Sequence, residues 1–552
     1  MNDKEEGYLG IDIGTQGLSV VWTDVNLHVV ATADSDHAYD FLPNLPPGHY
    51  EQHCADWDAA LRSALHRLQE KLNSTGDCST GRSRSIHPLA IGISGHMHGA
   101  VLADAKGTAL TSVRLWCDTR NQEDGRVLTQ TLQTKVPQRA TAARWRGIVR
   151  DAIASGSDVP HRTAQLTTPA GWIAYRLTGD WTLGIGDAAG MFPIDPKTQT
   201  FDPQQLQVFD NALLSGLESS SSSPPPPLGS LLPIVEHVNS PAVHRVTAAA
   251  AQEFGVLPEG TPVAAAEGDQ VAALAGSLIG TPGAVACSFG TSVCANVVAD
   301  NTAAPFVGIA PAVDHFCAAD GAPIHMVWLQ NGTTFLNAMV QAYTLTGESS
   351  DDAFATAMPA LLAAPPDCGG LLALPFLDDE PGVLGRNPND DTRATAAMIV
   401  GWTSTNANIG NIAKAALLAT MFNLKLGCKI LQDQDIPLTE LILTGGLTKT
   451  PACGQILADV FDRPVTLLDD SADEGSGWGA AVIAKYKHLS TTAVANEQPT
   501  WPAFLQLLGQ ATSRTRFDPE PSAVKEYQAV FQRYQQLLAL HRQIAAAVAT
   551  EQ

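Results

Sequence analysis

A glycine-rich turn between two apolar runs carries the first residues that could do chemistry. Residues 8–22 predict a β-hairpin with the turn Gly14-Thr15-Gln16-Gly17. Glycines let the backbone approach an anion closely, and Thr15 and Gln16 can donate hydrogen bonds to it. Asp12 would repel a phosphate unless a divalent cation lay between them, and Mg²⁺ prefers oxygen ligands. The alternative is an ordinary turn with a solvated carboxylate, and recurrence of the pattern favours the phosphate site.

The same layout recurs in the second half of the chain. Residues 284–298 predict a strand, the turn Gly290-Thr291-Ser292 and a second strand. Residues 441–444 predict another strand, which ends in the pair Gly445-Gly446 before a helix over 454–461. A glycine pair against a helix start suits an adenine face or an α-phosphate. The repeat indicates two similarly folded halves, each lending a loop to one nucleotide.

Two further strand ends carry polar groups in the first half. Residues 89–94 predict a buried strand followed by Gly95-His96-Met97-His98-Gly99, and residues 262–266 predict a strand followed by Glu267-Gly268-Asp269-Gln270. Loops at the carboxyl ends of strands are where α/β proteins bind ligands. Histidines are often merely structural, but two framed by glycines favour a binding role. A carboxylate at a strand-to-helix junction can take a proton from a bound hydroxyl.

Composition bounds the class of protein. A chain of 552 residues is too long for one core, so two sizeable domains are expected. The net charge of -23 argues against nucleic acid or an anionic membrane as the partner, but not against ATP held by backbone donors and Mg²⁺. With a charged N-terminus and no membrane-length apolar run, a cytoplasmic enzyme is expected. The nine scattered cysteines predict reduced thiols rather than a metal site.

Other elements frame these motifs. Apolar spacing predicts helices over 57–72 and 167–177, and residues 186–190 read as a turn. Asp118 and Arg120 are expected to pair as a loop brace. Residues 219–227, SSSSSPPPP, predict a surface insertion without catalytic meaning. A helix over 523–548 has one apolar stripe, which is expected to pack on a domain surface or a dimer partner, so a homodimer is possible.

Taken in order from residue 8 to about 485, these motifs resemble the FGGY carbohydrate kinases, and within that family the xylulose kinases. The matching segments are Gly10–Thr15, Glu51-Gln52 with Trp57, Gly95–Gly99, Leu115–Asp118 with Arg120, Asp187–Gly190, Gly268–Gln270, Ser288–Ser292, Thr444–Gly446, Gln455–Val460 and Gly477–Ala481. The resemblance implies an α/β, two-domain, actin-like ATPase (ribonuclease H-like) fold with a cleft between its domains. The domains are expected at 1–272 and 273–490, followed by an extension and helix over 491–552.

The resemblance also implies a role for each matching residue. These roles are the Mg²⁺-linked aspartate (Asp12), the first phosphate loop (Thr15, Gln16), the ketose-contacting pair (Met97, His98), the catalytic base (Asp269), a neighbouring sugar contact (Gln270), the second phosphate loop (Gly290, Thr291) and the nucleotide-binding glycine pair (Gly445, Gly446). The reaction it implies is ATP-dependent phosphorylation of D-xylulose to D-xylulose 5-phosphate in pentose catabolism. Mg²⁺ and N–H groups would neutralise the transferred charge.

The chain differs from the common family sequence at several positions. Leu447 and Thr450 differ from common family residues, and Asp378-Asp379-Glu380-Pro381 replaces a family segment, with Arg386-Asn387-Pro388 following. These differences bear on nucleotide preference and on the hinge.

D-ribulose or another ketose or polyol is an alternative substrate. An actin-like ATPase without a sugar substrate, or a sugar sensor without turnover, is an alternative of another class, but the sugar pair and both aspartates favour the kinase.

Overall fold

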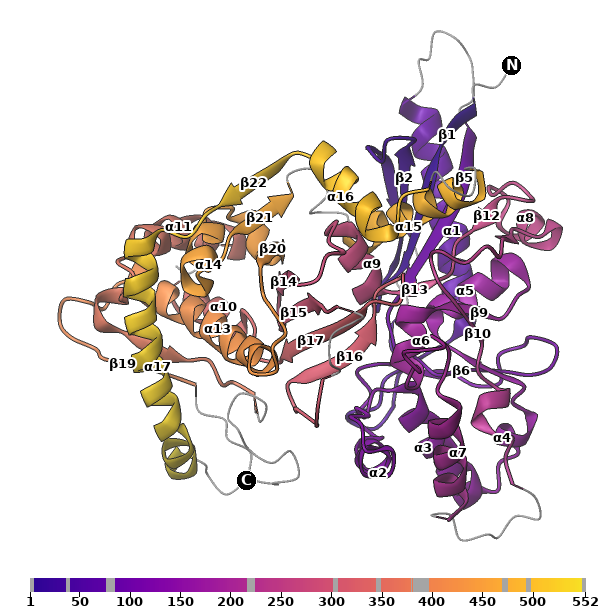
Figure 1. Cartoon of the computed structure of the whole chain (residues 1–552), viewed down its shortest axis with the longest axis horizontal. Helices are drawn as coiled ribbons and strands as arrows, with labels where there is room; N and C mark the ends of the chain where they lie inside the picture. The colour runs from indigo at the N-terminus through magenta and orange to yellow at the C-terminus, as the bar shows by residue number, and fades with distance from the viewer. Residues whose placement is uncertain are drawn as a thin grey trace. The chain divides into compact units, whose positions relative to one another are not determined.

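The computed structural model describes residues 4–35, 40–75, 85–215, 224–300, 306–343, 349–378, 380, 397–468, 475–492 and 498–548. The serines of the 219–227 insertion, and Asp379, Pro381 and Arg386-Asn387-Pro388, lie outside these residues. The chain forms two compact units (Figure 1). Unit 1 comprises Met1–Gly280, His315–Pro323 and Asp473–Leu508, and unit 2 comprises Thr281–Asp314, Ile324–Ala472 and Gly509–Gln552.

Unit 1 is built on a mixed sheet. Its described strands are β1 (Lys4–Ile13), β2 (Leu18–Asp24), β3 (Val29–Asp34), β5 (Ser85–Gly95), β11 (His244–Arg245), β12 (Pro262–Val263) and β13 (Glu267–Gly268). The order is β11-β12-β5-β1-β2-β3, with β13 also paired to β5. β1, β2 and β3 are antiparallel neighbours, whereas β5 runs parallel to β1. The predicted hairpin is therefore confirmed, with Ile13 opposite Leu18 across its turn.

The sheet of unit 2 repeats this topology. Its described strands are β14 (Ala284–Phe289), β15 (Val293–Val298), β16 (Val313–Cys317), β17 (Pro323–Leu329), β20 (Glu440–Gly445), β21 (Val465–Leu468) and β22 (Arg514–Phe517). The order is β16-β17-β15-β14-β20-β21-β22. β14 pairs antiparallel with β15 and parallel with β20, as β1 does with β2 and β5. Two similarly folded halves are thus confirmed.

Helices and short strand pairs surround the sheet of unit 1. The helices are α1 (Cys54–Thr75), α2 (Gln122–Leu132), α3 (Thr141–Ser155), α4 (Val159–Arg162), α5 (Pro169–Thr178), α6 (Ile185–Met191), α7 (Pro203–Ser215), α8 (Ala248–Phe254), α9 (Asp269–Gly276), α15 (Gly475–Thr492) and α16 (Trp501–Ala511), whose end reaches unit 2. The strand pairs are β4 (Glu51–Gln52) with β7 (Val113–Arg114), β6 (Val101–Ala103) with β8 (Gln165–Thr167), and β9 (Thr182–Gly184) with β10 (Ile234–Glu236).

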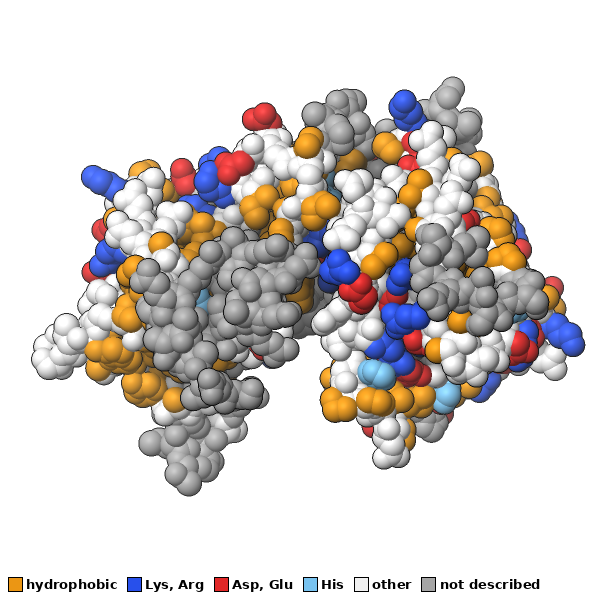
Figure 2. All heavy atoms as spheres, turned by 90° about the horizontal axis from the view of Figure 1, so that it is seen from below, with side chains coloured by type: hydrophobic (Ala, Val, Ile, Leu, Met, Phe, Trp, Pro, Cys, Tyr) orange, Lys and Arg blue, Asp and Glu red, His pale blue; other side chains and the backbone are white. Residues whose placement is uncertain are grey.

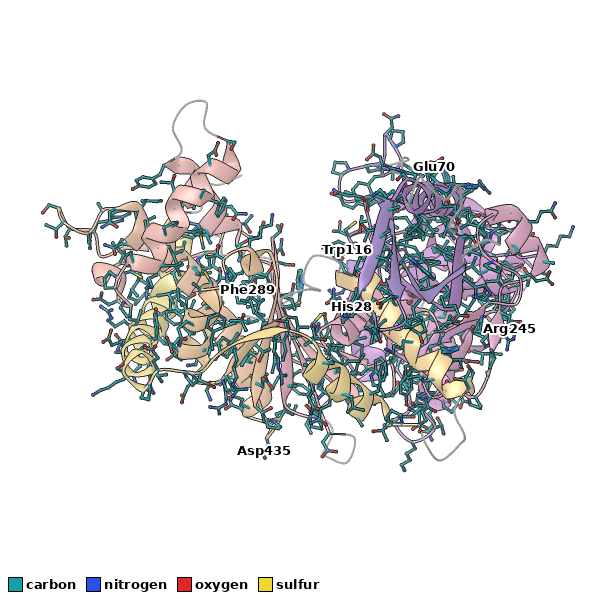
Figure 3. All side chains as sticks on the ribbon, turned by 90° about the horizontal axis from the view of Figure 1, so that it is seen from above. His28, Glu70, Trp116, Arg245, Phe289 and Asp435 are labelled. Carbon is teal, nitrogen blue, oxygen red and sulfur yellow. The ribbon has the colours of Figure 1, made fainter. Side chains whose placement is uncertain are left out.

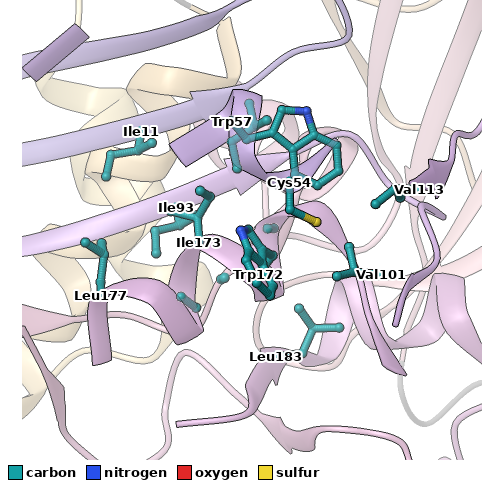
Figure 4. Packing of buried hydrophobic residues seen from close by; sticks show 14 of the residues in the cluster. Ile11, Cys54, Trp57, Ile93, Val101, Val113, Trp172, Ile173, Leu177 and Leu183 are labelled. Carbon is teal, nitrogen blue, oxygen red and sulfur yellow. The ribbon is translucent and has the colours of Figure 1, made fainter. Parts of the chain in front are cut away.

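The core of unit 1 lies between its sheet and helices. Figure 4 shows Trp57 of α1 and Trp172 of α5 among aliphatic side chains that include Ile11 of β1 and Ile93 of β5. The apolar residues that predicted α1 are buried, because its spacing of three and four residues directs them to one face. The core fixes where β1 and β5 end, and therefore where the loops that follow them begin.

Unit 2 has its own core and its own helices. These are α10 (Thr334–Ala342), α11 (Ser350–Ala363), α13 (Ile409–Gln432), α14 (Cys453–Phe461) and α17 (Pro521–Val548), with β18 (Leu372–Leu374) paired to β19 (Met398–Val400). The apolar stripe of α17 packs on this unit, as Tyr527, Val530 and Tyr534 are buried there and the Tyr534 hydroxyl donates to Asn423 Oδ1 at 2.6 Å. Packing on a domain surface is confirmed for this helix.

The structure differs from the sequence-based expectation at several places. The strand expected over 262–266 ends at Val263, and Glu267-Gly268 form the separate strand β13. Residues 186–190, expected to form a turn, lie inside α6, because small residues and a buried Asp187 continue the helical backbone. Residues 475–490, expected with the second domain, form α15, which packs against β1, β5 and α9 in unit 1 (Figure 1). The chain therefore returns to unit 1 near its C-terminal end.

Neither the face in Figure 2 nor the described thiols define a class of protein. Acidic and basic side chains lie beside one another on the face in Figure 2, so the net charge of -23 is not gathered there. Within the described ranges, no helix is long and apolar enough to cross a membrane. The cysteines that the structure describes are free thiols.

Candidate active site

Three neighbouring strands of unit 1 end side by side and bring the predicted acceptor residues together. Asp12 of β1 is paired with Ser94 of β5, and Glu267 of β13 is paired with Ser94 from the other side. Asp12 and Asp269 therefore lie on opposite sides of the end of β5, from which the Met97-His98 loop continues. The parallel arrangement of these strands is the cause, because it gathers their carboxyl ends at one edge.

Asp269, the first residue of α9, contacts the loop that follows β5. The backbone N–H of Met97 donates to its carboxylate, and the N–H of Gln270 donates to Oδ1 at 2.8 Å. Desolvation by surrounding protein and the charge of Asp12 raise the pKa of Asp269 to about 7. A carboxylate with a pKa near neutrality is a stronger proton acceptor than an ordinary one and is still ionised in useful amounts at neutral pH. This group can act as a general base.

Asp12 has a different environment at the end of β1. Ser94 Oγ donates to Asp12 Oδ1 at 2.6 Å, and desolvation raises the pKa of the carboxyl group. Among the described residues no Lys or Arg pairs with it, and no group of three His, Cys, Asp or Glu side chains encloses a metal position. One carboxylate beside a glycine turn fits Mg²⁺, which usually keeps several waters and takes one or two carboxylates beside substrate phosphates.

The Met97-His98 loop is held from several sides. Met97 is buried, and a Cβ on Gly268 would lie 2.3 Å from its Cγ, so the close approach requires glycine there. His98 has a φ of +70°, in the left-handed region that non-glycine residues rarely adopt. Its Nδ1 lies 3.0 Å from the carbonyl oxygen of Gly190 on α6. Desolvation and the nearby charge of Arg139 lower the pKa of His98 to about 3, so its ring is neutral.

The first glycine turn is fixed by side chains of matched motifs. Gly14 N–H donates to the oxygen of Gly17 at 2.9 Å and closes the turn. Gln52 Nε2 donates to the backbone oxygen of Thr15 at 2.7 Å, and Trp57 Nε1 in turn donates to Gln52 Oε1 at 3.0 Å. The Glu51-Gln52 and Trp57 motifs therefore support the turn, although they are distant from it in sequence.

Trp116 adds an aromatic wall beside this turn. It is 41% exposed and donates from Nε1 to Thr15 Oγ1 at 2.9 Å (Figure 3). The hollow that it borders has a volume of about 650 Å³ and is lined by Thr15, Gln16, Phe41, Gly48, Tyr50, Trp116, Cys117 and Thr119. A hollow of this size with aromatic walls and a few polar groups suits a small organic ligand.

The predicted brace between Asp118 and Arg120 is present. Arg120 Nη2 lies 2.6 Å from Asp118 Oδ2 and 2.7 Å from Glu51 Oε1. Asp118 Oδ2 also accepts the backbone N–H of Tyr50 at 2.9 Å. The guanidinium thereby ties the segment around Trp116 to the strand that carries Gln52.

In unit 2 the other turn and the glycine pair lie next to each other. Parallel pairing of β14 with β20 sets Phe289 opposite Gly445, so Gly290-Thr291 and Gly445-Gly446 follow adjacent strand ends. Gly445 has a φ of +77°, and a Cβ there would lie 2.7 Å from the oxygen of Phe289. Figure 3 labels Phe289, the residue whose backbone oxygen lies against Gly445. The strand end therefore requires glycine, which leaves its backbone open to a flat ligand.

A second loop supports the Gly290-Thr291 turn. Thr333 N–H donates to the oxygen of Gly290 at 2.8 Å, and Gly332 N–H donates to that of Thr291 at 3.0 Å. The neighbouring Asn331 is fixed by Glu380, whose Oε2 accepts its N–H at 3.1 Å. Glu380, a departure from the family sequence, thus belongs to the framework that holds this turn.

The comparison with protein families decides the assignment. A family model described as the FGGY family of carbohydrate kinases, N-terminal domain, matches residues 7–276, and the C-terminal domain of the same family matches residues 285–488. The chain belongs to the FGGY family of carbohydrate kinases. Both predicted site regions lie inside these two matched spans.

Individual relatives agree with the family. The chain is 24% identical over 539 residues to the xylulose kinase of Haemophilus influenzae, covering 96% of this chain and 98% of that protein. It is 26% identical to the xylulose kinase of Escherichia coli, covering 97% and 99%. Among solved structures, the gluconate kinase of Lactobacillus acidophilus superposes with a TM-score of 0.76 at 19% identity, over 97% of this chain and 98% of that one. The two-domain actin-like fold expected from the sequence is confirmed.

Two carboxyl groups beside the candidate site were given no role from the sequence. Asp187 on α6 is fully buried and accepts a hydrogen bond from Thr168 Oγ1 at 2.6 Å, whereas its Oδ1 has no partner among the residues that the structure describes. Glu267 accepts the backbone N–H of Asp187 at 2.9 Å. The match of Asp187–Gly190 to a family motif could have indicated a role for Asp187. Only the fold shows that this motif packs against the Met97-His98 loop. Trp116 likewise carried a signal in its match but was given no role.

Proposed function

We propose that this FGGY carbohydrate kinase transfers the γ-phosphate of ATP to the terminal hydroxyl of a ketopentose, with D-xylulose the first candidate. The observation that carries the proposal is the close approach of the segment before Asp269 to the Met97-His98 loop, where a Cβ on Gly268 would lie 2.3 Å from Met97 Cγ. Asp269 begins α9 beside the loop expected to bind the sugar, which supports its assignment as the general base. The full-length similarity to two xylulose kinases supports D-xylulose over other acceptors.

In the proposed reaction, Asp269 takes the proton of the sugar hydroxyl while that oxygen attacks the γ-phosphorus. His98 and Gln270 bind the ketose beside it, and Met97 shapes the loop. Kinases of this family use ATP, generally with Mg²⁺, and Asp12 would hold the hydrated ion, which supplies charge neutralisation at the phosphates. N–H groups of the Thr15-Gln16 turn provide further donors.

The nucleotide-binding assignments in unit 2 are part of the same proposal. Gly290 and Thr291 would contact phosphate through backbone N–H groups, and the Gly445-Gly446 strand end would accept the adenosine. The adjacency of these two turns on β14 and β20 supports one common ligand. Positioning by backbone donors agrees with the acidic net charge, because it needs few Lys or Arg side chains.

D-ribulose or another ketose or polyol is the second candidate, and the similarity in fold to a gluconate kinase favours including a sugar acid in the test. ADP release by the full-length protein should be measured with D-xylulose, D-ribulose, glycerol and gluconate at saturating ATP and Mg²⁺. D-xylulose is expected to give the highest kcat/KM. Higher turnover with another acceptor would reassign the substrate, and ADP release unaffected by any acceptor would contradict sugar phosphorylation.

A further inference from the structure

His98 is held in a backbone conformation that needs support. Its φ of +70° is costly for a residue with a Cβ. One support is the ring contact between Nδ1 and the Gly190 oxygen at 3.0 Å. Since a carbonyl oxygen only accepts hydrogen bonds, Nδ1 carries the ring proton, and Nε2 is the nitrogen with the free lone pair. No hydrogen bond to Nε2 occurs among the described residues.

The other support comes from Arg144 on α3, which sequence reasoning did not single out. Its side chain has no exposed surface, and Nε donates to the His98 oxygen at 3.0 Å and to the Arg139 oxygen at 3.1 Å. Nη1 and Nη2 are buried, and neither has a hydrogen-bond partner within the described ranges. The charge of Asp118 favours the Arg144 cation, but a buried guanidinium that is hydrogen-bonded at only one nitrogen is still costly for stability.

The surrounding charges also act on the histidine ring. Arg139, which precedes α3, and Arg144 both disfavour a positive charge on His98, in addition to the effect of desolvation, and so lower its pKa. Across the loop, the Gly190 carbonyl of α6 acts in the opposite direction and raises the pKa of His98 through its hydrogen bond with Nδ1. The net result keeps the ring neutral, so that Nε2 can accept a hydrogen bond but cannot donate one.

We propose that Arg144 is a positioning residue that holds His98 so that its Nε2 accepts a hydrogen bond from a hydroxyl of the acceptor substrate. This inference rests on the proposed function, because it assumes that the Met97-His98 loop binds the acceptor. It narrows the substrate class, since the position opposite Nε2 must be a hydroxyl donor. A ketone, carboxylate or deoxy carbon at that position would leave Nε2 unpaired and would bind more weakly.

The test combines kinetics with NMR of the full-length protein. The variants are Arg144→Gln, which removes the charge, Arg144→Lys, which keeps it but changes the donor geometry, and His98→Ala, alone and with Arg144→Gln. Arg150→Gln is the control, because Arg150 lies on the same helix but pairs with Asp124 and Asp151. The His98 ring signals are assigned from ¹⁵N-histidine spectra by their loss in His98→Ala.

Both Arg144 variants are expected to raise KM for D-xylulose on the order of tenfold, the size of one net hydrogen bond, with KM for ATP and kcat nearly unchanged. Arg144→Gln should also weaken the preference for a proton on Nδ1. In the His98→Ala background, Arg144→Gln should raise KM no further, since it acts through His98. Arg150→Gln should change neither readout.

Two results would overturn the inference: unchanged His98 signals in folded Arg144→Gln and Arg144→Lys proteins, or an equal KM increase with and without His98. The NMR readout needs no substrate. If the Arg144 variants alter the His98 ring as expected but no acceptor is phosphorylated, the proposed function fails while the contact between Arg144 and His98 stands as a structural support, and the hydroxyl assignment is withdrawn.

Discussion

Asp12 and Asp269 are both carboxylates at strand ends of unit 1, yet their partners suit them to different work. Asp269 accepts backbone N–H groups from Met97 and Gln270, which orient it toward the acceptor loop. Asp12 accepts one hydroxyl hydrogen bond from Ser94 and lies beside the glycine turn. A proton acceptor must lie near the sugar, whereas a metal ligand must lie near the phosphates, and the two environments match this division.

At the residue scale, the first prediction concerns His98. His98→Ala should raise KM for the ketose far more than KM for ATP, because it removes a hydrogen-bond acceptor from the acceptor site only. The increase should be on the order of tenfold or more for a buried hydrogen bond. Initial rates with each substrate varied in turn provide the measurement. Equal increases in both KM values would show that this loop does not contact the sugar.

A second prediction at this scale concerns Asp12. Asp12→Asn keeps the side-chain shape but removes the charge that a hydrated Mg²⁺ would contact. The Mg²⁺ concentration for half-maximal rate should rise at least several-fold, whereas KM for the ketose should change little. Titration of the rate with Mg²⁺ at fixed ATP tests this. An unchanged Mg²⁺ requirement would remove Asp12 from the metal site.

At the element scale, α15 lies against β1, β5 and α9 by contacts between backbones. A Cβ on Gly92 of β5 would lie 1.8 Å from the oxygen of Ala480, and one on Gly479 would lie 1.8 Å from the oxygen of Ala272. Such distances leave no room for a methyl group. Because β5 leads into the Met97-His98 loop and α9 begins with Asp269, the close packing of α15 fixes the two parts of the proposed acceptor site relative to each other.

Gly92→Ala should therefore destabilise unit 1 although it adds only one methyl group. Overpacking of this kind typically costs about 1–3 kcal/mol, more where backbone must move. Thermal unfolding should show a lower Tm than wild type. Gly17→Ala is the control, since a Cβ at Gly17 would meet no atom within 4 Å and the φ of Gly17 is not in the left-handed region. A Tm for Gly92→Ala equal to that of the control would contradict this packing account.

The sequence predicted the strands and turns of the site well because these depend on local patterns. Apolar runs broken by Gly-Thr turns define both hairpins, and the position of Asp269 follows from a strand that leads into a helix. The role of α15 could not be predicted, because a Gly-Trp-Gly sequence does not reveal which backbone it will approach. Arg144 could not be predicted for a similar reason: its partner is a backbone oxygen 46 residues earlier in the chain.

At the scale of the whole molecule, the buried carboxyl groups beside the candidate site make the free energy of unfolding depend on pH. Desolvation raises the pKa of Asp187 to about 7 and also raises that of Glu267. Both groups bind protons more tightly in the folded protein than in the unfolded chain, where Asp titrates near pH ~4. Between pH ~4 and the Asp187 pKa of about 7, the folded state binds more protons than the unfolded chain. The contribution of these carboxyl groups to the free energy of unfolding therefore falls as pH rises.

Asp187→Asn should therefore change the pH dependence of stability in a defined direction. The Tm of wild type minus that of the variant should fall as pH rises from about 4 to about 7, with a free-energy slope of at most about 1.4 kcal/mol per pH unit. The partly exposed Asp104 is the control of opposite sign, because the Thr108 N–H lowers its pKa. Asp104→Asn should cost stability above its pKa and none below. A Tm difference for Asp187→Asn that does not vary with pH would contradict the raised pKa.

The central claim is that Asp269 accepts the proton of a sugar hydroxyl in a phosphoryl transfer, and Asp269→Asn tests it most directly. The variant keeps the shape and can still hydrogen-bond the sugar, so ketose binding by calorimetry should survive. Its kcat should fall about 10²–10⁴-fold, because only the proton transfer is lost. Wild-type kcat should also fall as pH decreases through the Asp269 pKa of about 7, where the carboxylate becomes protonated. Near-normal kcat in Asp269→Asn, with ketose bound, would contradict the account.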